Sequence, residues 1–285
     1  MKKVVMLIPA LMLANNRKAN HSAMTYGLEN YPVDEFIVND AEYAPEDYRP
    51  EFTYIGHHAE RQGFVKTRNQ LLKHFYNSDA DYAIWMDANG RVSKSTLNDL
   101  STILNALKTG EVDMDVIYST LGINISGERI AVKKMPDYLD NVYLVKFKNG
   151  YDWMHGMIMK NFKKYYGVEP YIDERCDPHV GTSEDIYFAR LLRRLFDYRL
   201  APTVTVSKPS NKTSTWVADK KGYKYPKPDY ATVEAYINEN PLCQTMPARP
   251  KTSRTILISR VDDFKSLIKP YKPKPRKKGE GLLQK

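Results

Sequence analysis

The segment from Asp81 to Gly90 constrains the fold more than any other part of the sequence. It reads Asp-Tyr-Ala-Ile-Trp-Met-Asp-Ala-Asn-Gly, so five apolar residues in a row end in two oxygen-bearing side chains, Asp87 and Asn89. A short apolar run closed by turn-forming residues is typical of a strand covered on both faces, as in the interior of an α/β sheet. Because ligands of such sheets bind beyond the carboxyl ends of the strands, Asp87 and Asn89 are candidate binding residues.

The two side chains stand two positions apart, which suits a shared ligand. Residues i and i+2 of an extended chain point to the same side, so both oxygens can converge on one hard cation. The alternative is a strand that ends in an ordinary Asp-Ala-Asn-Gly turn and binds nothing. These ten residues alone do not decide between the two interpretations.

Two further patterns place this strand in an α/β sheet. Residues 63–76 repeat apolar side chains at helical spacing, so a helix leads directly into the strand. At the start of the chain, residues 4–8 and 36–40 have the pattern of strands, and residues 16–30 between them have helical spacing. This β-α-β unit predicts an α/β fold with Pro9 and Asp40 at neighbouring strand tips, where they would flank one cleft.

The second informative stretch is residues 181–194, which begin Gly-Thr-Ser-Glu-Asp and continue with an apolar stripe. Ser183 can cap a helix, and the acids Glu184 and Asp185 suit the positive end of its dipole. On this interpretation the acids only begin a helix and need no catalytic role.

The order of these patterns resembles the centre of the GT-A fold of nucleotide-sugar glycosyltransferases. Thr67-Arg68-Asn69 begins the helix, Asp87-Ala88-Asn89 ends the strand, and Ser-Glu-Asp-Ile-Tyr-Phe-Ala follows about a hundred residues later. The family usually has Ala-Arg-Asn and Asp-X-Asp, so Thr67 and Asn89 depart from its pattern. The resemblance implies a Rossmann-like mixed sheet flanked by helices.

The resemblance also implies a metal-dependent enzyme that uses a nucleoside diphosphate sugar, preferably a UDP-sugar, as donor. Asp87 and Asn89 would hold Mn²⁺ or Mg²⁺ on the diphosphate, which stabilises the charge of the leaving group. The implied donor-binding residues are Pro9, Asp40, Arg68, Asp87, Lys208 and Lys212. The two lysines stand where family members often supply a metal-binding histidine, and the alternative for them is a solvated loop.

For the acceptor side, the resemblance singles out the Glu-Asp pair and residues 150–161. It implies Asp185 as the catalytic base, with Glu184 second, and a transferred hexose or pentose. Acceptor-binding residues would be Trp153, His155 and Gly156, where a glycine lets the backbone approach the sugar. The alternative for residues 150–161 is a buried Trp and Met cluster around a helix start.

Length and composition set the domain organisation. The chain has 285 residues, 42% of them hydrophobic, and no apolar run long enough to cross a bilayer. We expect one GT-A domain over residues 1–268 and a basic, proline-spaced, disordered tail over residues 269–285. The two cysteines, Cys176 and Cys243, form neither a disulfide framework nor a zinc signature, and this fits a cytoplasmic protein. The apolar run after Met1 is interpreted as a strand, with a secretory signal as the alternative.

The net charge of +9 and the pI of about 9.2 indicate an anionic partner. A small basic transferase without a membrane anchor is similar to the phage enzymes that glycosylate hydroxymethylcytosine in DNA. We therefore expect double-stranded DNA as the acceptor, in the cytoplasm of the host cell, with no membrane and no obligate protein partner. The alternatives are a cytoplasmic transferase that builds a surface glycan and a non-enzymatic nucleic-acid-binding protein.

Overall fold

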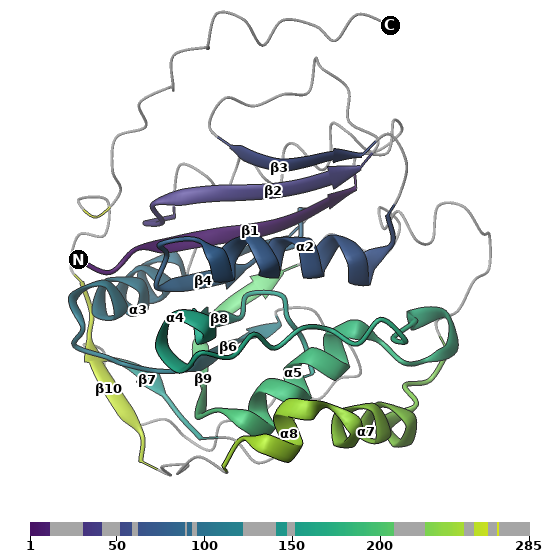
Figure 1. The fold of residues 1–285 in the computed structure, drawn as a ribbon. Helices are drawn as coiled ribbons and strands as arrows, with labels where there is room; N and C mark the ends of the chain where they lie inside the picture. Colours follow the sequence, from purple (N-terminus) through teal and green to yellow (C-terminus); the bar gives the residue numbers. More distant parts are fainter. Residues whose placement is uncertain are drawn as a thin grey trace, which may run out of the picture.

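The structure is a computed structural model that describes residues 1–11, 31–41, 52–58, 62–88, 90–92, 96–121, 141–146, 152–207, 226–247, 254–261 and 267. Its centre is an eight-stranded mixed sheet with the strand order β3-β2-β1-β4-β8-β6-β9-β5 (Figure 1). The strands are β1 (Val4–Leu11), β2 (Glu35–Ala41), β3 (Thr53–His58), β4 (Tyr82–Trp85), β5 (Arg91–Val92), β6 (Val116–Leu121), β8 (Ile158–Lys160) and β9 (Tyr198–Ser207). The α/β fold expected from the sequence is confirmed.

The first half of the sheet is parallel, which places several strand ends at one edge. β1 pairs in parallel with both β2 and β4, and β2 pairs in parallel with β3. The second half is mixed, because β8 runs antiparallel to β4 and β6, whereas β6 and β9 are parallel. The carboxyl ends of β1, β2 and β4 therefore lie side by side.

Strand β4 is covered on both faces, as its apolar sequence predicts. All four of its residues are buried. Tyr82 and Ile84 belong to one hydrophobic core, and Ala83 and Trp85 belong to the other, as the period of two along a strand requires. The central strand thus separates two cores.

Helices and a small second sheet cover the two faces (Figure 1). One core contains residues of α2 (Phe64–Asn77), α4 (Phe162–Tyr166), α5 (Glu184–Leu195) and α7 (Tyr230–Glu239), and α8 (Pro241–Thr245) packs at its edge. The other core contains α3 (Leu97–Thr109) and the antiparallel pair of β7 (Asn141–Leu144) and β10 (Ile256–Ser259). A 3₁₀ turn at Pro178–Val180 precedes α5. No helix among the described segments has both the length and the apolar character needed to cross a bilayer.

Two local expectations hold in part. For residues 150–161 the sequence predicts either a ligand-facing segment or a buried Trp and Met cluster around a helix start. Met154, Met157 and Met159 are buried and Asn161 is the N-cap of α4, but Ile158–Lys160 also forms strand β8 in the middle of the sheet, and the ligand-facing role stays a prediction. Ser183 occupies the N-cap position of α5, yet its side chain makes no capping hydrogen bond. The expected helix at residues 16–30 and the tail at residues 269–285 lie outside the described residues.

Gly156 is the position where the fold most limits the choice of residue. It lies in a turn closed by a hydrogen bond from Met157 N to Met154 O (2.9 Å), and its φ is 74°. A Cβ atom there would lie 2.7 Å from Val206 Cγ1 and 3.1 Å from the Cβ of Ser119. Both backbone conformation and space therefore require glycine.

We predict that Gly156→Ala lowers the free energy of unfolding more than Gly110→Ala does. Gly110 has a similar φ of 81° but nothing within 4 Å of its added Cβ, so it reports backbone strain alone, about 1 to 2 kcal/mol. Gly156→Ala should cost about 1 to 3 kcal/mol more, because Val206 must move. Urea denaturation of both variants measures the difference, and equal losses would show that the contact with Val206 is unimportant.

Candidate functional site

The polar residues that end the central strands lie at one edge of the sheet. Asp87 follows β4 by two residues, and the register of β1 with β2 pairs Pro9 with Asn39 and Ala10 with Asp40. Pro9 and Asp40 therefore occupy neighbouring strand tips, as the β-α-β pattern predicts. The side chain of Asp40 is not among the described ones.

Arg68 of α2 lies at the centre of the site. Its side chain is only 5% exposed, and Nη1 contacts Glu184 Oε1 at 3.1 Å and a carboxylate oxygen of Asp185. Nη2 lies 3.5 Å from Asp87 Oδ1. One guanidinium thus joins the start of α2, the end of β4 and the start of α5. We call Asp87, Glu184 and Asp185 the carboxylate cluster.

The carboxylates around Arg68 keep its guanidinium protonated. Burial by itself lowers the pKa of the guanidinium, but Asp185, Glu184 and Asp87 outweigh burial and raise the pKa above its ordinary value. The guanidinium also lies 5.6 Å from the Trp85 ring centroid, where the ring face attracts a cation. Arg68 therefore stays charged at any pH at which the protein is folded.

The two acids at the start of α5 differ in accessibility. Burial raises the pKa of Glu184; the charge of Arg68 opposes this shift, and the charge of Asp185 adds to it. Asp185 is the more exposed, with 13% of its side chain accessible against 6% for Glu184. Both acids stand in the first turn of α5, where the helix dipole favours negative charge. Asp185 is therefore the more accessible of the two acids.

His155 supports the turn that carries Asp87. The backbone N–H of Asp87 donates to His155 Nδ1 at 3.1 Å, and the N–H of Gly90 donates to the carbonyl of Asp87 at 2.7 Å. The imidazole is buried against Gly90, where an added Cβ would lie 1.7 Å from Cε1. His155 thus positions the backbone of Asp87 through this hydrogen bond. The contact of His155 with an acceptor, which the family resemblance implies, stays a prediction.

The other acceptor-side candidates lie next to this turn. Gly156 donates its N–H to the carbonyl of Trp85 at 2.7 Å, so the turn is joined to the end of β4. Trp153 is half-buried. The structure therefore brings Arg68, Asp87, His155, Gly156, Glu184 and Asp185 together. Asn89, Lys208 and Lys212 lie outside the described residues.

The carboxylates of this site are compatible with a divalent cation whose remaining ligands come from a phosphate. In the described part of the chain, no three His, Cys, Asp or Glu side chains are arranged as a metal site, because the carboxylate cluster converges on Arg68. Mg²⁺, however, needs only one or two carboxylates when phosphate oxygens complete its shell. Three carboxylates and one guanidinium carry a formal charge of −3 + 1 = −2, which a divalent ion would balance. The cation site at Asp87 and Asn89 that the family resemblance implies stays a prediction.

Two features of this site are not evident from the sequence. The Thr-Arg-Asn motif is a signal for Arg68, but it indicates a donor-binding residue and not a contact with the carboxylate cluster. The packing of His155 against Gly90 has no local signal, because 65 positions separate the two residues. The glycine after Asp-Ala-Asn by itself indicates only a turn.

We predict that the effects of Gly90→Ala and His155→Ala on the free energy of unfolding are not additive. Gly90→Ala alone forces the imidazole away, and His155→Ala alone leaves a cavity and an unsatisfied Asp87 N–H, so each should cost about 1 to 3 kcal/mol. In the double variant the new methyl group occupies part of the vacated space. The double-mutant cycle, measured by thermal denaturation, should show a favourable coupling of about 1 kcal/mol or more. Simple additivity would mean that the ring does not pack on Gly90.

Comparisons with known proteins identify the fold. No protein-family model matches the sequence, and no curated protein matches it. Among solved structures, S. aureus TarS superposes with a TM-score of 0.51 at 14% identity, over 84% of this chain and 40% of that one. TarS residues 1–349 in complex with UDP-GlcNAc give 0.49 at 17% identity, over 83% and 66% of the two chains.

A mannosyltransferase from Pyrobaculum calidifontis, in complex with GDP-Man and Mn²⁺, gives a TM-score of 0.43 at 13% identity, over 83% of this chain and 69% of that one. The chain spans two fifths of the full TarS chain. The likeness to TarS at a TM-score of 0.51 supports the fold, and the chain has a GT-A-type mixed α/β fold.

Proposed function

We propose that this chain is a glycosyltransferase that moves a sugar from a nucleoside diphosphate sugar to a hydroxyl group. The observation that carries the proposal is the meeting of Arg68, Asp87 and the Glu184–Asp185 pair at the carboxyl edge of the sheet. A helix start alone would explain the two acids. It would not explain why both contact a buried arginine that also faces the acid at the end of the central strand.

On the donor side, Asp87 and Asn89 would hold Mn²⁺ or Mg²⁺, which supplies positive charge to the leaving diphosphate. Arg68 adds a fixed positive charge beside them and can bind phosphate oxygens through two N–H groups at once. Pro9 and Asp40 stand at the neighbouring strand tips, where the base and ribose of a UDP-sugar would lie. Lys208 and Lys212 are the remaining candidates for neutralising the diphosphate.

On the acceptor side, Asp185 would act as the base. Its carboxylate takes the proton of the acceptor hydroxyl, the oxygen attacks the anomeric carbon, and the bond from that carbon to the diphosphate oxygen breaks. This role requires inversion of the anomeric centre. Arg68 holds the carboxylate in place through Nη1, and Glu184 shares the same nitrogen, so the guanidinium positions both acids.

The proposal is tested with labelled UDP-sugars and three variants. Asp87→Ala should abolish release of UDP, because the leaving diphosphate loses its cation site, and Asp185→Asn should lower turnover roughly 10² to 10⁴-fold with little change in donor binding. Asp79→Ala is the control, since Asp79 is 77% exposed and pairs with Lys3. Arg68 keeps two carboxylate partners in either active-site variant, so melting temperatures should change little. Wild-type UDP release by Asp87→Ala would refute the donor assignment.

Hydroxymethylcytosine in duplex DNA is the second proposal for the acceptor, and the net charge of +9 is the observation that favours it. Lysine and arginine contacts to phosphates release counterions, so the log of the binding constant should fall with log salt by about 0.9 per phosphate. Binding of hydroxymethylated and plain duplexes, measured between low and high salt, checks this. Truncation before Lys269 should reduce the slope. No binding at low salt would exclude DNA and leave a glycan as the acceptor.

A further inference from the structure

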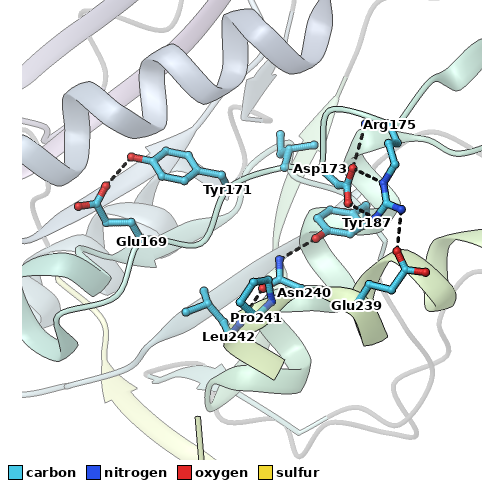
Figure 2. Close-up of a pocket in the computed structure, with 10 residues that line it drawn as sticks. Glu169, Tyr171, Asp173, Arg175, Tyr187, Glu239, Asn240, Pro241 and Leu242 are labelled. Atoms are coloured by element: carbon cyan, nitrogen blue, oxygen red, sulfur yellow. Dashed lines mark hydrogen bonds and ion pairs between the residues drawn. The ribbon is translucent and has the colours of Figure 1, made fainter. Parts of the chain in front are cut away.

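A pocket of about 420 Å³ lies beside α5 (Figure 2), and no residue of the carboxylate cluster lines it. The loop before the 3₁₀ turn forms one wall, α5 contributes Tyr187, and the junction of α7 and α8 forms the other wall. Its lining includes Glu169, Tyr171, Asp173, Arg175, Tyr187 and Glu239. The volume is within the range of about 300 to 1,000 Å³ that is usual for small-molecule sites.

The pocket combines aromatic rings with polar groups that are already oriented. Tyr171 donates its hydroxyl to Glu169 at 2.5 Å, and Asn240 donates to the hydroxyl of Tyr187 at 2.8 Å. Arg175 is fixed by a two-nitrogen contact with Asp173, at 3.0 and 2.7 Å. Side chains held in this way offer donors and acceptors in set directions without losing further side-chain entropy on binding.

The charge of the pocket argues against an anionic occupant. Three carboxylates and one guanidinium line it, which gives a formal charge of −3 + 1 = −2. The positive charge is engaged, because Nη1 of Arg175 also lies 2.6 Å from Glu239 Oε2. A phosphate or a nucleic acid would meet net repulsion here. A neutral molecule rich in hydroxyl groups would instead find carboxylate acceptors and the half-buried ring of Tyr171.

Two hydrogen bonds and one shared helix connect the pocket to the carboxylate cluster. Asn69, the residue after Arg68, makes two hydrogen bonds with the backbone of Ile172, at 2.8 and 2.9 Å. Tyr187 follows Glu184 by three residues on α5, which is about 4.5 Å along the helix axis. Neighbouring residues of α2 therefore hold the two sites, and one helix lines both.

We propose that this pocket is an acceptor subsite that binds a neutral sugar unit of a saccharide whose next unit receives the transferred sugar. This inference rests on the proposed glycosyltransferase activity and adds to it the class of acceptor, an uncharged saccharide. The hydroxyl that reacts lies at Asp185, and the pocket holds the neighbouring unit. Binding in the pocket therefore sets which saccharides are used, and the chemistry takes place at the carboxylate cluster.

The binding test uses the full chain and NMR titration with glucose, galactose, mannose, N-acetylglucosamine and their disaccharides. At least one saccharide should shift the backbone amides of Glu169–Arg175 and of Glu239–Leu242 in a saturable way. The affinity should be the same in low and high salt, because the ligand is neutral. Saturation by none of the saccharides, or shifts confined to other segments, would overturn the proposal, as would a strong loss of affinity in high salt.

The kinetic test uses Tyr171→Ala, with Tyr230→Ala as its matched control. Tyr230 is an exposed tyrosine at the other end of α7, nine residues or about 13 Å from Glu239 along the helix, and it does not line the pocket. Tyr171→Ala should weaken binding of the saccharide roughly tenfold. It should keep the basal release of UDP from the donor but lose the acceleration that the saccharide causes in the wild type. Tyr230→Ala should behave as the wild type.

The two readouts separate failure of this inference from failure of the proposed function. Basal UDP release without saccharide binding in the pocket would support the transferase activity and refute the subsite. Saccharide binding in the pocket without UDP release would refute the transferase activity, and with it the acceptor role of the pocket. Equal acceleration in Tyr171→Ala and the wild type would also overturn the subsite.

Discussion

The contact of one buried guanidinium with three carboxylates is the interaction on which the arrangement of this site depends. Arg68 meets Asp87, Glu184 and Asp185, which come from segments up to 117 residues away in the chain. Removing one partner of a buried ion pair costs about 3 to 5 kcal/mol, because the remaining charge is left without compensation. Here the loss of the arginine would leave three carboxylates facing one another. The cluster therefore holds its shape only as long as a cation is present among the acids.

This dependence has a consequence for ligand binding. A diphosphate brings anionic oxygens that compete with the carboxylates for the same N–H groups of Arg68, and a divalent ion brings the charge that the cluster lacks. A divalent ion would balance the formal charge of −2, whereas a diphosphate alone would add negative charge beside the carboxylates. On the proposed function, the electrostatics of Arg68 and its partners therefore disfavour binding of the donor without a cation.

The strands whose patterns are local could be predicted from the sequence, and so could the two long helices next to them. β1 is an apolar run, β2 and β4 are apolar runs followed by polar residues, and α2 and α3 have apolar side chains at helical spacing. β8 could not be predicted in this way. It has three residues, it follows a turn at Gly156, and it is a strand because β4 and β6 pair with it on both sides. That information is distributed over distant parts of the chain.

The residues of the site also differ in whether a local pattern or a distant contact determines their role. Asp87 and the Glu184–Asp185 pair stand in motifs that a local pattern can reveal, whereas the roles of their supports depend on contacts across the fold. His155 acts through the backbone N–H of Asp87, and its ring has room only because residue 90 is glycine. Asn69 acts through the backbone of Ile172. Residues of this kind act by positioning other residues. A local sequence pattern does not indicate which residue each of them will contact.

The two acceptor classes place opposite demands on local charge, and net charge does not decide between them. DNA needs positive side chains where its phosphates pass, and a neutral saccharide needs hydrogen-bonding groups without excess positive charge. The chain carries +9 overall, yet the carboxylate cluster with Arg68 and the pocket beside α5 each carry a formal charge of −2. The excess of lysine and arginine is therefore located elsewhere in the chain. Charges in water are screened within about 10 Å, so the charge next to a bound acceptor matters more than the net charge of the chain. On the proposed function, an acceptor at Asp185 meets the negative charge of the carboxylate cluster, and a neutral saccharide tolerates that better than a nucleic acid does.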